Sequence, residues 1–214
     1  MAPGLTTFTT PPARPPLPPP SAPRRRELHK GEVLYYAEDE AASLYRVDEG
    51  LLKLSLDLAS GRERITQLVG PGDYLGALTG APHYGERAEA LSARVAVSEA
   101  PKTDTPDREV FTATGEQLRR VRDALEDTDL PVAARLARTL LRLGGRFGHA
   151  AETGVVHLTL PLTHDTLAAL VGAARETTTA LLGEMRASGV LSGTRGRYSF
   201  NPARLLEFAH EAAL

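Results

Sequence analysis

The sequence predicts an α+β protein: an N-terminal antiparallel β-roll of the jelly-roll type, a long linking or dimerisation helix, and a C-terminal winged helix-turn-helix. Three observations support this prediction. Apolar residues recur at every second position as far as about residue 99, their spacing becomes helical after Pro106, and two short helical segments around a glycine precede a glycine-rich hairpin. The expected parts are a proline-rich disordered tail (1–26), the β-roll (27–106), the linking helix region (107–129) and the winged helix-turn-helix domain (130–214).

The composition limits the kinds of protein that this chain can be. With 214 residues, 42% of them hydrophobic, it is long enough to bury a core, and two small domains are expected. The absence of cysteine excludes disulfides and thiolate metal sites and fits a reducing compartment. No apolar run approaches the roughly 18 residues that a membrane span requires, and prolines stand where a signal peptide needs an apolar stretch. A cytoplasmic protein with no membrane partner is therefore expected.

The formal net charge of −2 hides an uneven distribution. Residues 27–129 carry 12 Lys and Arg against 21 Asp and Glu, a net charge of −9, whereas residues 130–214 carry 9 against 6, a net charge of +3. The acidic and basic parts are expected to be different modules. A modestly basic C-terminal domain is compatible with binding to a polyanion.

The N-terminal tail is rich in proline. Nine of the 16 prolines lie between residues 3 and 23, so this segment has little to bury and few backbone donors, and it is expected to be extended. Three arginines follow at positions 24–26. We interpret them as part of a solvated linker, with an extra polyanion contact as the alternative.

Alternating residues predict the strands of the roll. In the segment LKLSLDL, the leucines alternate with polar residues, so one face should be buried and the other wet. The leucines of this predicted buried face are Leu52, Leu54, Leu56 and Leu58. The runs LYRV, RITQLV and ARVAV also resemble strands, and turn signals fall at Glu49-Gly50, Ser60-Gly61 and Gly70-Pro71-Gly72.

Two helices are expected before the C-terminal motif. Thr114 and Gln117 have the spacing of a capping box, so the first helix should begin near Thr114, with an apolar stripe of Leu118, Val121 and Leu125. This stripe is narrow enough to pack either on its own domain or on a second copy, and the spacing leaves both open. Pro131 can start a second helix, PVAARLARTLLRLGGRF, whose end is weakened by glycines 144 and 145. Its expected apolar face comprises Leu136, Leu140, Leu141 and Leu143.

The segment LTHDTLAALVGAARETTTALLGEMRASGVL has the pattern of a helix-turn-helix. Gly172 can adopt the left-handed turn that separates two short helices, the first with Leu167, Leu170 and Val171 on one side. The residues expected to point inward from the second helix are Thr178, Leu181, Leu182 and Met185.

The N-terminal end of the second helix then faces outward. Arg175, Glu176 and Thr179 lie on this side, at the end that a recognition helix inserts into the major groove. An arginine fork matches guanine, a glutamate accepts from cytosine, and a threonine meets phosphate or a thymine methyl. Three consecutive threonines from Thr177 onward are poor for helix stability, which indicates selection for fit to a partner. A surface ion pair between Arg175 and Glu176 is the alternative interpretation.

The segment SGTRGRYSF follows directly and resembles a two-stranded wing. Gly193 and Gly196 flank Arg195, and Arg197 begins the second strand. Basic wing tips usually contact phosphates, which fix register without reading sequence. A solvated hairpin is the alternative.

Over residues 28–200 the chain resembles the CRP/FNR family of bacterial transcription regulators. The most specific match is LTHDTLAALVGAARETTTALL, which is similar to the DNA-binding signature of that family, and LPVAARLARTLLRL is similar to the helix before it. LYRVDEGLLKLSL and GPGDYLGAL resemble the strands and glycine turn of the effector roll. The resemblance implies a homodimer joined by a coiled coil around Leu118, Val121 and Leu125, with Arg175 and Glu176 as the pair that reads bases.

These expectations define a hypothesis for function. Two winged domains would enter successive major grooves of double-stranded DNA at a pseudo-palindromic operator. Thr177, Thr179, Thr163 and His164 would grip the backbone, Arg195 and Arg197 would hold phosphates, and an activator would also contact RNA polymerase. Two departures from the family pattern matter. Ala180 stands where readers of the best-known operator carry a second arginine, and Ala174 replaces a frequent capping serine.

The effector pocket departs further from the family. Cyclic-nucleotide binders carry a glutamate for ribose and an Arg-Ser pair for phosphate, where this chain has Ala77 and Arg87-Ala88. An unpaired ribose hydroxyl in a closed pocket is costly, so we expect cAMP to bind weakly or not at all. Gly76 and Arg87 are the residual candidates for a degenerate effector pocket, with a structural role for Arg87. Constitutive binding, control by another ligand and control by cAMP stay open.

Other classes of protein are less well supported. The six histidines are scattered without a His-x-His, which argues against a cupin-type metal enzyme, and no Walker loop, nucleophile elbow or His-Glu-x-x-His motif occurs. No catalytic or metal-binding residue is expected. A haem-type sensor would need His83 or His29 as a ligand. A sensor with a vestigial helix-turn-helix is a further alternative.

Overall fold

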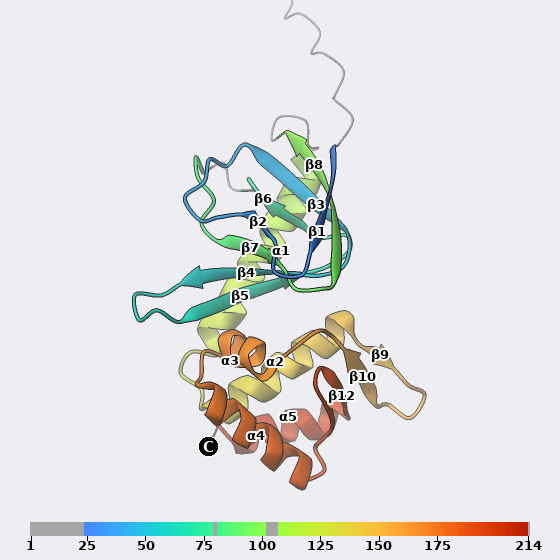
Figure 1. The fold of residues 1–214 in the computed structure, drawn as a ribbon. Coiled ribbons are helices and arrows are strands. Elements are labelled where there is room, and N and C mark those ends of the chain that lie inside the picture. The colour runs from blue at the N-terminus through green and yellow to red at the C-terminus, as the bar shows by residue number, and fades with distance from the viewer. Residues whose placement is uncertain (1–23, 79–80, 102–106, 214) are drawn as a thin grey trace, which may run out of the picture.

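The computed structural model describes residues 24–78, 81–101 and 107–213, and Figure 1 shows an upper β-rich unit, a long helix and a lower helical unit. Over its described part, the upper unit contains two four-stranded antiparallel sheets with the orders β1-β8-β3-β6 and β2-β7-β4-β5. Their bounds are β1 Arg24–His29, β2 Val33–Tyr35, β3 Ser43–Glu49, β4 Leu52–Asp57, β5 Glu63–Val69, β6 Tyr74–Gly76, β7 Arg87–Ala90 and β8 Arg94–Pro101. Val47, Leu52, Val69, Ala88 and Val95 are fully buried in the core of this roll.

The roll begins earlier than its expected start at residue 27. Residues 24–26 belong to β1, where Arg24, Arg25 and Arg26 pair with Glu99, Ser98 and Val97 of β8. The interpretation of these arginines as linker is therefore wrong. Four consecutive charged residues, Arg24 to Glu27, hid the strand, since no alternation marks it and its neighbour β8 lies far away in the sequence. The rest of the predicted tail, residues 1–23, lies outside the described residues.

The expected buried face of β4 is only half correct. Leu52 and Leu54 are buried, but Leu56 is 37% exposed and Leu58, just after the strand, is 41% exposed. The pairing with β5 shifts register between Leu54 and Ser55, and beyond this point the β4–β5 hairpin extends past the rest of the roll (Figure 1). No opposing sheet in the described part of the roll covers these two leucines, so strict alternation overestimates their burial.

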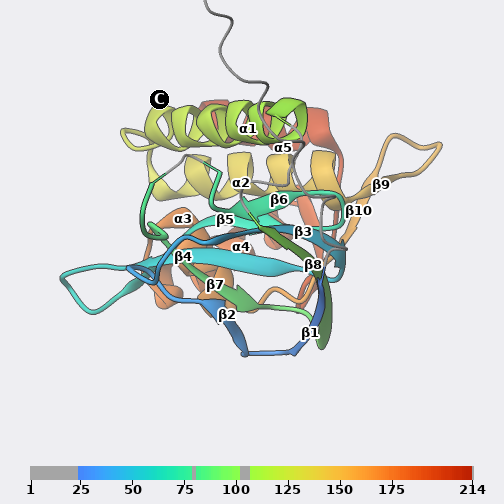
Figure 2. The ribbon, with the colours of Figure 1, turned by 90° about the horizontal axis from the view of Figure 1, so that it is seen from above.

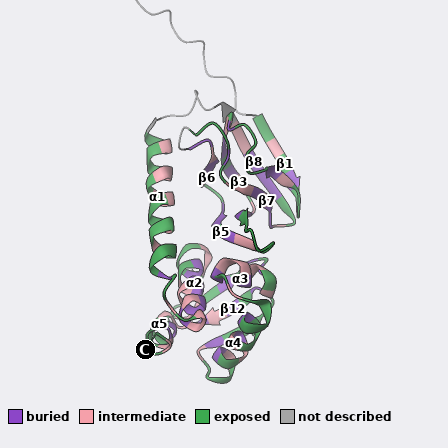
Figure 3. Ribbon diagram, turned by 90° about the vertical axis from the view of Figure 1, so that its left-hand side faces the viewer, coloured by how far each residue is buried: buried purple, intermediate pink, exposed green. Residues whose placement is uncertain are grey.

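The linking helix α1 spans Asp107–Glu126 and begins well before Thr114. The predicted cap at Thr114 is wrong, because the Thr114 hydroxyl donates to the carbonyl oxygen of Val110 inside the helix, at 2.8 Å. The apolar stripe contains Leu118 at 69% exposure and Leu125 at 66%, with Phe111 at 80%. Figure 3 shows that the outer side of α1, away from the roll, is largely exposed. The stripe is therefore not packed against the described residues of its own chain.

The lower unit combines four helices with a small antiparallel sheet of order β11-β12-β10-β9, counted over the described residues. Its elements are α2 Val132–Phe147, β9 His149–Ala150, β10 Val156–Thr159, α3 His164–Val171, α4 Arg175–Ala187, β11 Leu191–Thr194, β12 Arg197–Phe200 and α5 Pro202–Glu211. Leu136, Leu140 and Leu143 of α2 are buried as predicted, and Leu141 is partly buried against the same core. The pattern analysis missed β9, β10 and α5. The start of α5 carries a clear signal, since Asn201 accepts from two backbone N–H groups and proline follows it.

The two units share one apolar cluster. Leu51, Ile65 and Leu68 of the roll belong to the same core as the helices of the lower unit, and β5 packs against α3. Arg146 of α2 strengthens this junction, because its guanidinium donates to the carbonyl oxygen of Leu68 at 2.6 Å and pairs with Asp73. Viewed from above, α1 runs along one side of the molecule (Figure 2). The lower unit is therefore seated on the roll as well as tethered to it.

Two adjacent glycines near the end of α2 generate a prediction about stability. A Cβ at Gly144 would lie 2.5 Å from Cζ of Phe200 and 3.2 Å from a methyl of Val156, whereas a Cβ at Gly145 would have no heavy atom within 4 Å. Gly144→Ala should lower the free energy of unfolding by about 1–3 kcal/mol through overpacking. Gly145→Ala should raise it by about 0.5–1 kcal/mol, because alanine is the better helix former. Urea denaturation of both variants measures these changes, and destabilisation of equal size would contradict the packing described for Phe200.

Candidate nucleic-acid interface

Helices α3 and α4 meet at a turn centred on Gly172. This residue is left-handed, with φ 70° and ψ 45°, and its N–H donates to the carbonyl oxygen of Ala168. Leu167 and Val171 of α3 and Leu182 of α4 are buried in the core of the lower unit. The turn and the inward faces are as the sequence predicts. The two helices therefore form a rigid support for whatever projects from the start of α4.

The run of threonines divides between core and solvent. Thr178 is completely buried, and its hydroxyl donates to the carbonyl oxygen of Ala174 at 3.0 Å, so its polar atom is satisfied within the helix. Met185 is also buried, while Leu181 is only partly covered. Thr177 and Thr179 are exposed on the opposite side. Burial of the middle threonine thus leaves its two neighbours on the outer surface.

The N-terminal turn of α4 presents its charged residues to solvent. Arg175 and Glu176 are both exposed, and α4 lies at the free end of the molecule away from the roll (Figure 1). The Nε atom of Arg175 lies 3.6 Å from a carboxylate oxygen of Asp165, with both side chains more than 60% exposed. The ion partner of Arg175 is therefore Asp165 of α3 rather than its neighbour Glu176. Ala174 is the N-cap of α4 and makes no side-chain hydrogen bond, so the backbone donors of this turn are left open.

Thr163 and His164 hold the start of α3. The Thr163 hydroxyl accepts from the backbone N–H of Thr166 at 3.1 Å and caps the helix. The Nδ1 atom of His164 lies 2.9 Å from the hydroxyl of Thr179, which joins the start of α3 to α4. Both residues therefore have local structural partners next to the exposed tip, and Thr163 is itself exposed.

The wing is a tight hairpin of β11 and β12. Arg195 and Gly196 form its turn with φ values of 53° and 78°, and Thr194 pairs with Arg197. Both arginines are exposed and make no ion pair within 4.0 Å among the residues that the structure describes. Arg186, in the last turn of α4, donates from Nε to the carbonyl oxygen of Gly193 at 2.9 Å and ties the wing to the helix. The wing therefore carries two exposed cations on the same small unit as Arg175.

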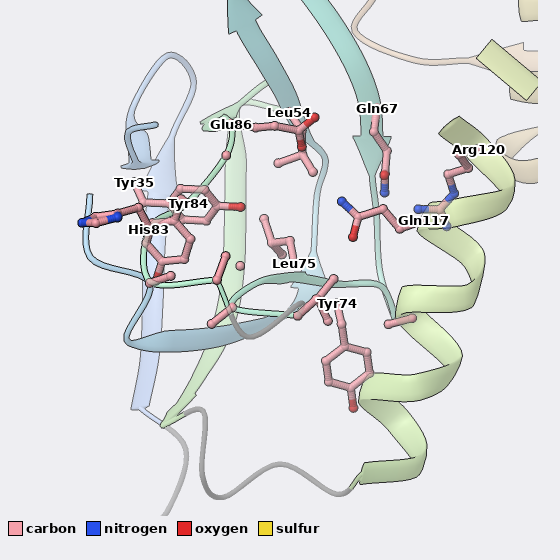
Figure 4. Close-up of a pocket in the computed structure, with 17 residues that line it drawn as sticks. Tyr35, Leu54, Gln67, Tyr74, Leu75, His83, Tyr84, Glu86, Gln117 and Arg120 are labelled. Carbon is pink, nitrogen blue, oxygen red and sulfur yellow. The ribbon is translucent and has the colours of Figure 1, made fainter. Parts of the chain in front are cut away.

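A cavity of about 230 Å³ lies in the roll against α1 (Figure 4). Gly76 and Ala77 line it, but Arg87 does not. The guanidinium of Arg87 instead lies 2.7 Å from Glu63 and 3.4 Å from Asp57, in a cluster of ion pairs on the other face of β7. The structure therefore does not bring the two residual effector candidates together.

Other side chains supply the polar groups of this cavity. Glu86 lines it from the residue before β7, and burial raises the pKa of its carboxyl. Gln67 comes from β5, while Gln117 and Arg120 come from α1 (Figure 4), whose apolar-stripe residues do not line the cavity. Sequence reasoning missed all four. The spacing of Gln117 and Arg120 was a usable signal, since residues three apart share one helix face.

The described residues contain neither a cluster of three or more metal ligands nor a membrane-spanning helix. Between residues 24 and 213, apart from the gaps, no group of three or more His, Cys, Asp or Glu side chains is arranged to hold a metal ion. Within the same ranges, none of the helices combines the length and the apolar character needed to cross a membrane.

Comparisons with known proteins agree with this architecture. Residues 25–104 match the model of the cyclic nucleotide-binding domain, and residues 134–208 match that of the Crp-like helix-turn-helix domain. A "CRP-like cAMP-activated global transcriptional regulator" of Mycobacterium tuberculosis is 30% identical over 177 residues, which cover 76% of this chain and 77% of that protein. The transcriptional regulator LdrP of Thermus thermophilus is 30% identical over 173 residues, covering 78% and 87%.

Solved structures give the same result. A CRP/FNR-family transcriptional regulator from Thermus thermophilus has a TM-score of 0.71 and 28% identity, covering 88% of this chain and 100% of that one. FixK2 from Bradyrhizobium japonicum, at 22% identity, shares the fold with a TM-score of 0.76, covering 91% and 98%. These relatives are transcription regulators rather than enzymes. By its two matched domains, the order of its elements and its identity to curated regulators, the chain belongs to the CRP/FNR family of transcription regulators.

Proposed function

We propose that two copies of this chain bind a pseudo-palindromic DNA operator through the N-terminal turns of their α4 helices, without requiring cAMP. The observation that carries this proposal is the exposed Arg175–Glu176 tip, held by a helix whose other side is buried. Arg175 offers guanine a bidentate fork, and Glu176 can accept from cytosine. The ion pair of Arg175 with Asp165 is solvent-exposed and therefore weak, so the arginine can exchange it for a base at small cost.

The residues around the tip support separate roles for α4 and for the wing. Thr177 and Thr179 have short side chains that let α4 approach the groove floor, while His164 and Thr163 flank the same edge. Arg195 and Arg197 project from the wing and suit phosphate oxygens. Base edges would then be read by α4, and register would be set by the wing.

The apolar stripe of α1 supports a dimer. Phe111, Leu118 and Leu125 recur at intervals of seven, and Val121 lies between the last two, which is the spacing of a two-stranded coiled coil. Exposed side chains of this size gain substantial free energy when a second copy covers them. A two-fold dimer would place its recognition helices in successive major grooves roughly 34 Å apart.

The roll cavity favours a function independent of cAMP. Ala77 has no acceptor for a ribose hydroxyl, and Arg87 is engaged by carboxylates outside the cavity. Glu86 lines the space and would repel an anionic phosphate when ionised. The second candidate is control by cAMP, and the match to the cyclic nucleotide-binding domain model favours it.

Arg175 and Arg197 should differ in the kind of binding that they support. Arg175→Ala should weaken binding to the preferred duplex by about 1–3 kcal/mol and relax one base position in each half-site. Arg197→Ala should weaken binding to preferred and random duplexes alike and reduce the salt dependence by about one counterion per contact. Fluorescence anisotropy with both duplexes across a salt series measures these effects.

The matched control is Arg46→Ala, which removes the same charge from the exposed surface of the roll and should leave both affinities unchanged. Identical behaviour of the Arg175 and Arg197 variants on the two duplexes would contradict the assigned roles. Unchanged binding after Arg175→Ala would instead favour a vestigial helix-turn-helix.

The dimer proposal predicts a monomer when the stripe carries charge. Leu118→Glu should shift the protein to monomer in sedimentation velocity and weaken operator binding by roughly a hundredfold, because two linked half-sites bind far better than one. Leu206→Glu on α5, where Leu206 is 45% exposed, is the control and should stay dimeric. A Leu118→Glu variant that sediments like the unmodified protein would place the dimer interface elsewhere.

The cavity predicts indifference to cAMP. Isothermal titration of cAMP should give no saturable heat, and selection of duplexes from a random pool should return the same operator with and without the nucleotide. A palindrome recovered only when cAMP is present would support the second candidate and refute the first.

A further inference from the structure

The outer face of the small sheet in the lower unit carries a row of polar side chains. In the register of this sheet, His149 of β9 lies directly opposite His157 of β10, and His157 lies opposite Ser199 of β12. Their strand neighbours Val156 and Phe200 pack on the core of the lower unit, so the alternation along the strands turns the histidines outward. Both histidines are exposed. The sheet therefore presents two adjacent imidazoles on one face.

Facing side chains of an antiparallel pair of strands are close enough to share one metal ion. Their Cβ atoms are about 4.5–5.5 Å apart. Two imidazole nitrogens on one tetrahedral ion, each bonded at about 2.0–2.1 Å, are roughly 3.3 Å apart. Exposed histidines can reach this separation by choosing among their side-chain rotamers. Sequence spacing did not reveal the pair, because the β9–β10 hairpin brings together residues that are not close in the chain.

The hydrogen bond of His157 prepares its ring for a metal ion. Its Nδ1 atom lies 2.8 Å from the hydroxyl of Ser199. When Nδ1 carries the proton and donates it to this hydroxyl oxygen, Nε2 keeps the lone pair that a metal ion requires. Strand β10 lies between β12 and β9, so His157 has Ser199 on one side and His149 on the other. The hydroxyl of Ser199 thus orients one imidazole for coordination next to the second.

We propose that His149 and His157 together bind a divalent transition-metal ion, such as Zn²⁺, with water molecules in its remaining coordination positions. Imidazole nitrogen suits Zn²⁺, Ni²⁺ and Cu²⁺, whereas Mg²⁺ and Ca²⁺ require oxygen ligands that this pair does not offer. The chain supplies two ligands, fewer than in a closed structural zinc site, so the ion exchanges with solvent. Access is open, because the β9–β10 hairpin projects from the lower unit (Figure 1).

A bound ion would secure the edge of the small sheet. Strand β9 comprises only His149 and Ala150, and two residue pairs join it to β10. An ion shared between the two strands binds their paired arrangement better than a separated one, so it stabilises the hairpin by linkage. This site is independent of the proposed binding to DNA.

Calorimetry of the untagged full chain with Zn²⁺, in the absence of DNA, tests the site. One Zn²⁺ per chain should bind saturably, and Mg²⁺ should give no saturable heat. His149→Ala and His157→Ala should each weaken Zn²⁺ binding by at least about tenfold, because losing a ligand costs no less than losing an outer-shell partner. The matched control is His210→Ala, which removes an exposed histidine of α5 and should leave the affinity unchanged. Unchanged affinity in either variant of the pair, or equal losses in all three variants, would overturn the proposal.

Electron paramagnetic resonance with Cu²⁺ as the probe counts the ligands directly. The unmodified chain should show two coordinated imidazole nitrogens and each variant of the pair only one. Ser199→Ala should keep both nitrogens and weaken binding by about tenfold, as expected for a positioning residue. Thermal unfolding without metal checks that the variants fold, since the histidines are exposed and their removal leaves the core intact. A single coordinated nitrogen in the unmodified chain would refute a shared ion.

Discussion

The burial of one side of α4 is the constraint on which the candidate interface depends. Thr178, Leu182 and Met185 are enclosed by the core of the lower unit, and this fixes the rotation of the helix about its axis. Once that rotation is set, the side chains at the start of α4 that face outward are determined as well. The buried threonine is tolerated because its hydroxyl bonds to the carbonyl of Ala174 in the preceding turn. Packing of one side of α4 in the core thus leaves an exposed polar surface on its other side.

Buried and exposed faces are also divided between the two units and along α1. The roll and the lower unit share an apolar cluster, supported by Arg146 where α2 ends. Helix α1 contributes Gln117 and Arg120 to the lining of the roll cavity. The apolar stripe of the same helix is not covered by the described residues. One helix therefore contributes to the lining of the cavity and also carries an exposed apolar stripe.

The sequence predicted the features that depend on local spacing. The helix-turn-helix, the left-handed Gly172 and the wing all follow from patterns within a few residues, and each is present. The errors involve contacts between distant segments. Residues 24–26 form a strand because they pair with β8, which is distant in the sequence. Leu56 is exposed because the β4–β5 hairpin extends beyond the sheet that would cover it. The cap expected at Thr114 matched a local pattern that the longer helix overrides.

The candidate sites also separate into features that local spacing determines and features that depend on distant segments. The outward direction of Arg175 and Glu176 could be predicted from sequence, because helix periodicity decides it. The lining of the roll cavity could not, because a shift of one position in a strand decides whether Glu86 or Arg87 faces inward. A cavity lined by the β4–β5 hairpin, the start of α2 and the turn at Gly172 was also beyond prediction, because these segments are far apart in the chain.

The missing side-chain cap at Ala174 has a physical consequence for α4 itself. Without a capping oxygen at Ala174, the first amide hydrogens of the helix lack a side-chain acceptor, and the opening turn lacks one of the bonds that would hold it closed. The positive end of the helix dipole is concentrated at this same turn. The exposed start of α4 is therefore the least well hydrogen-bonded part of this helix, and an oxyanion bound there would accept from its free amides.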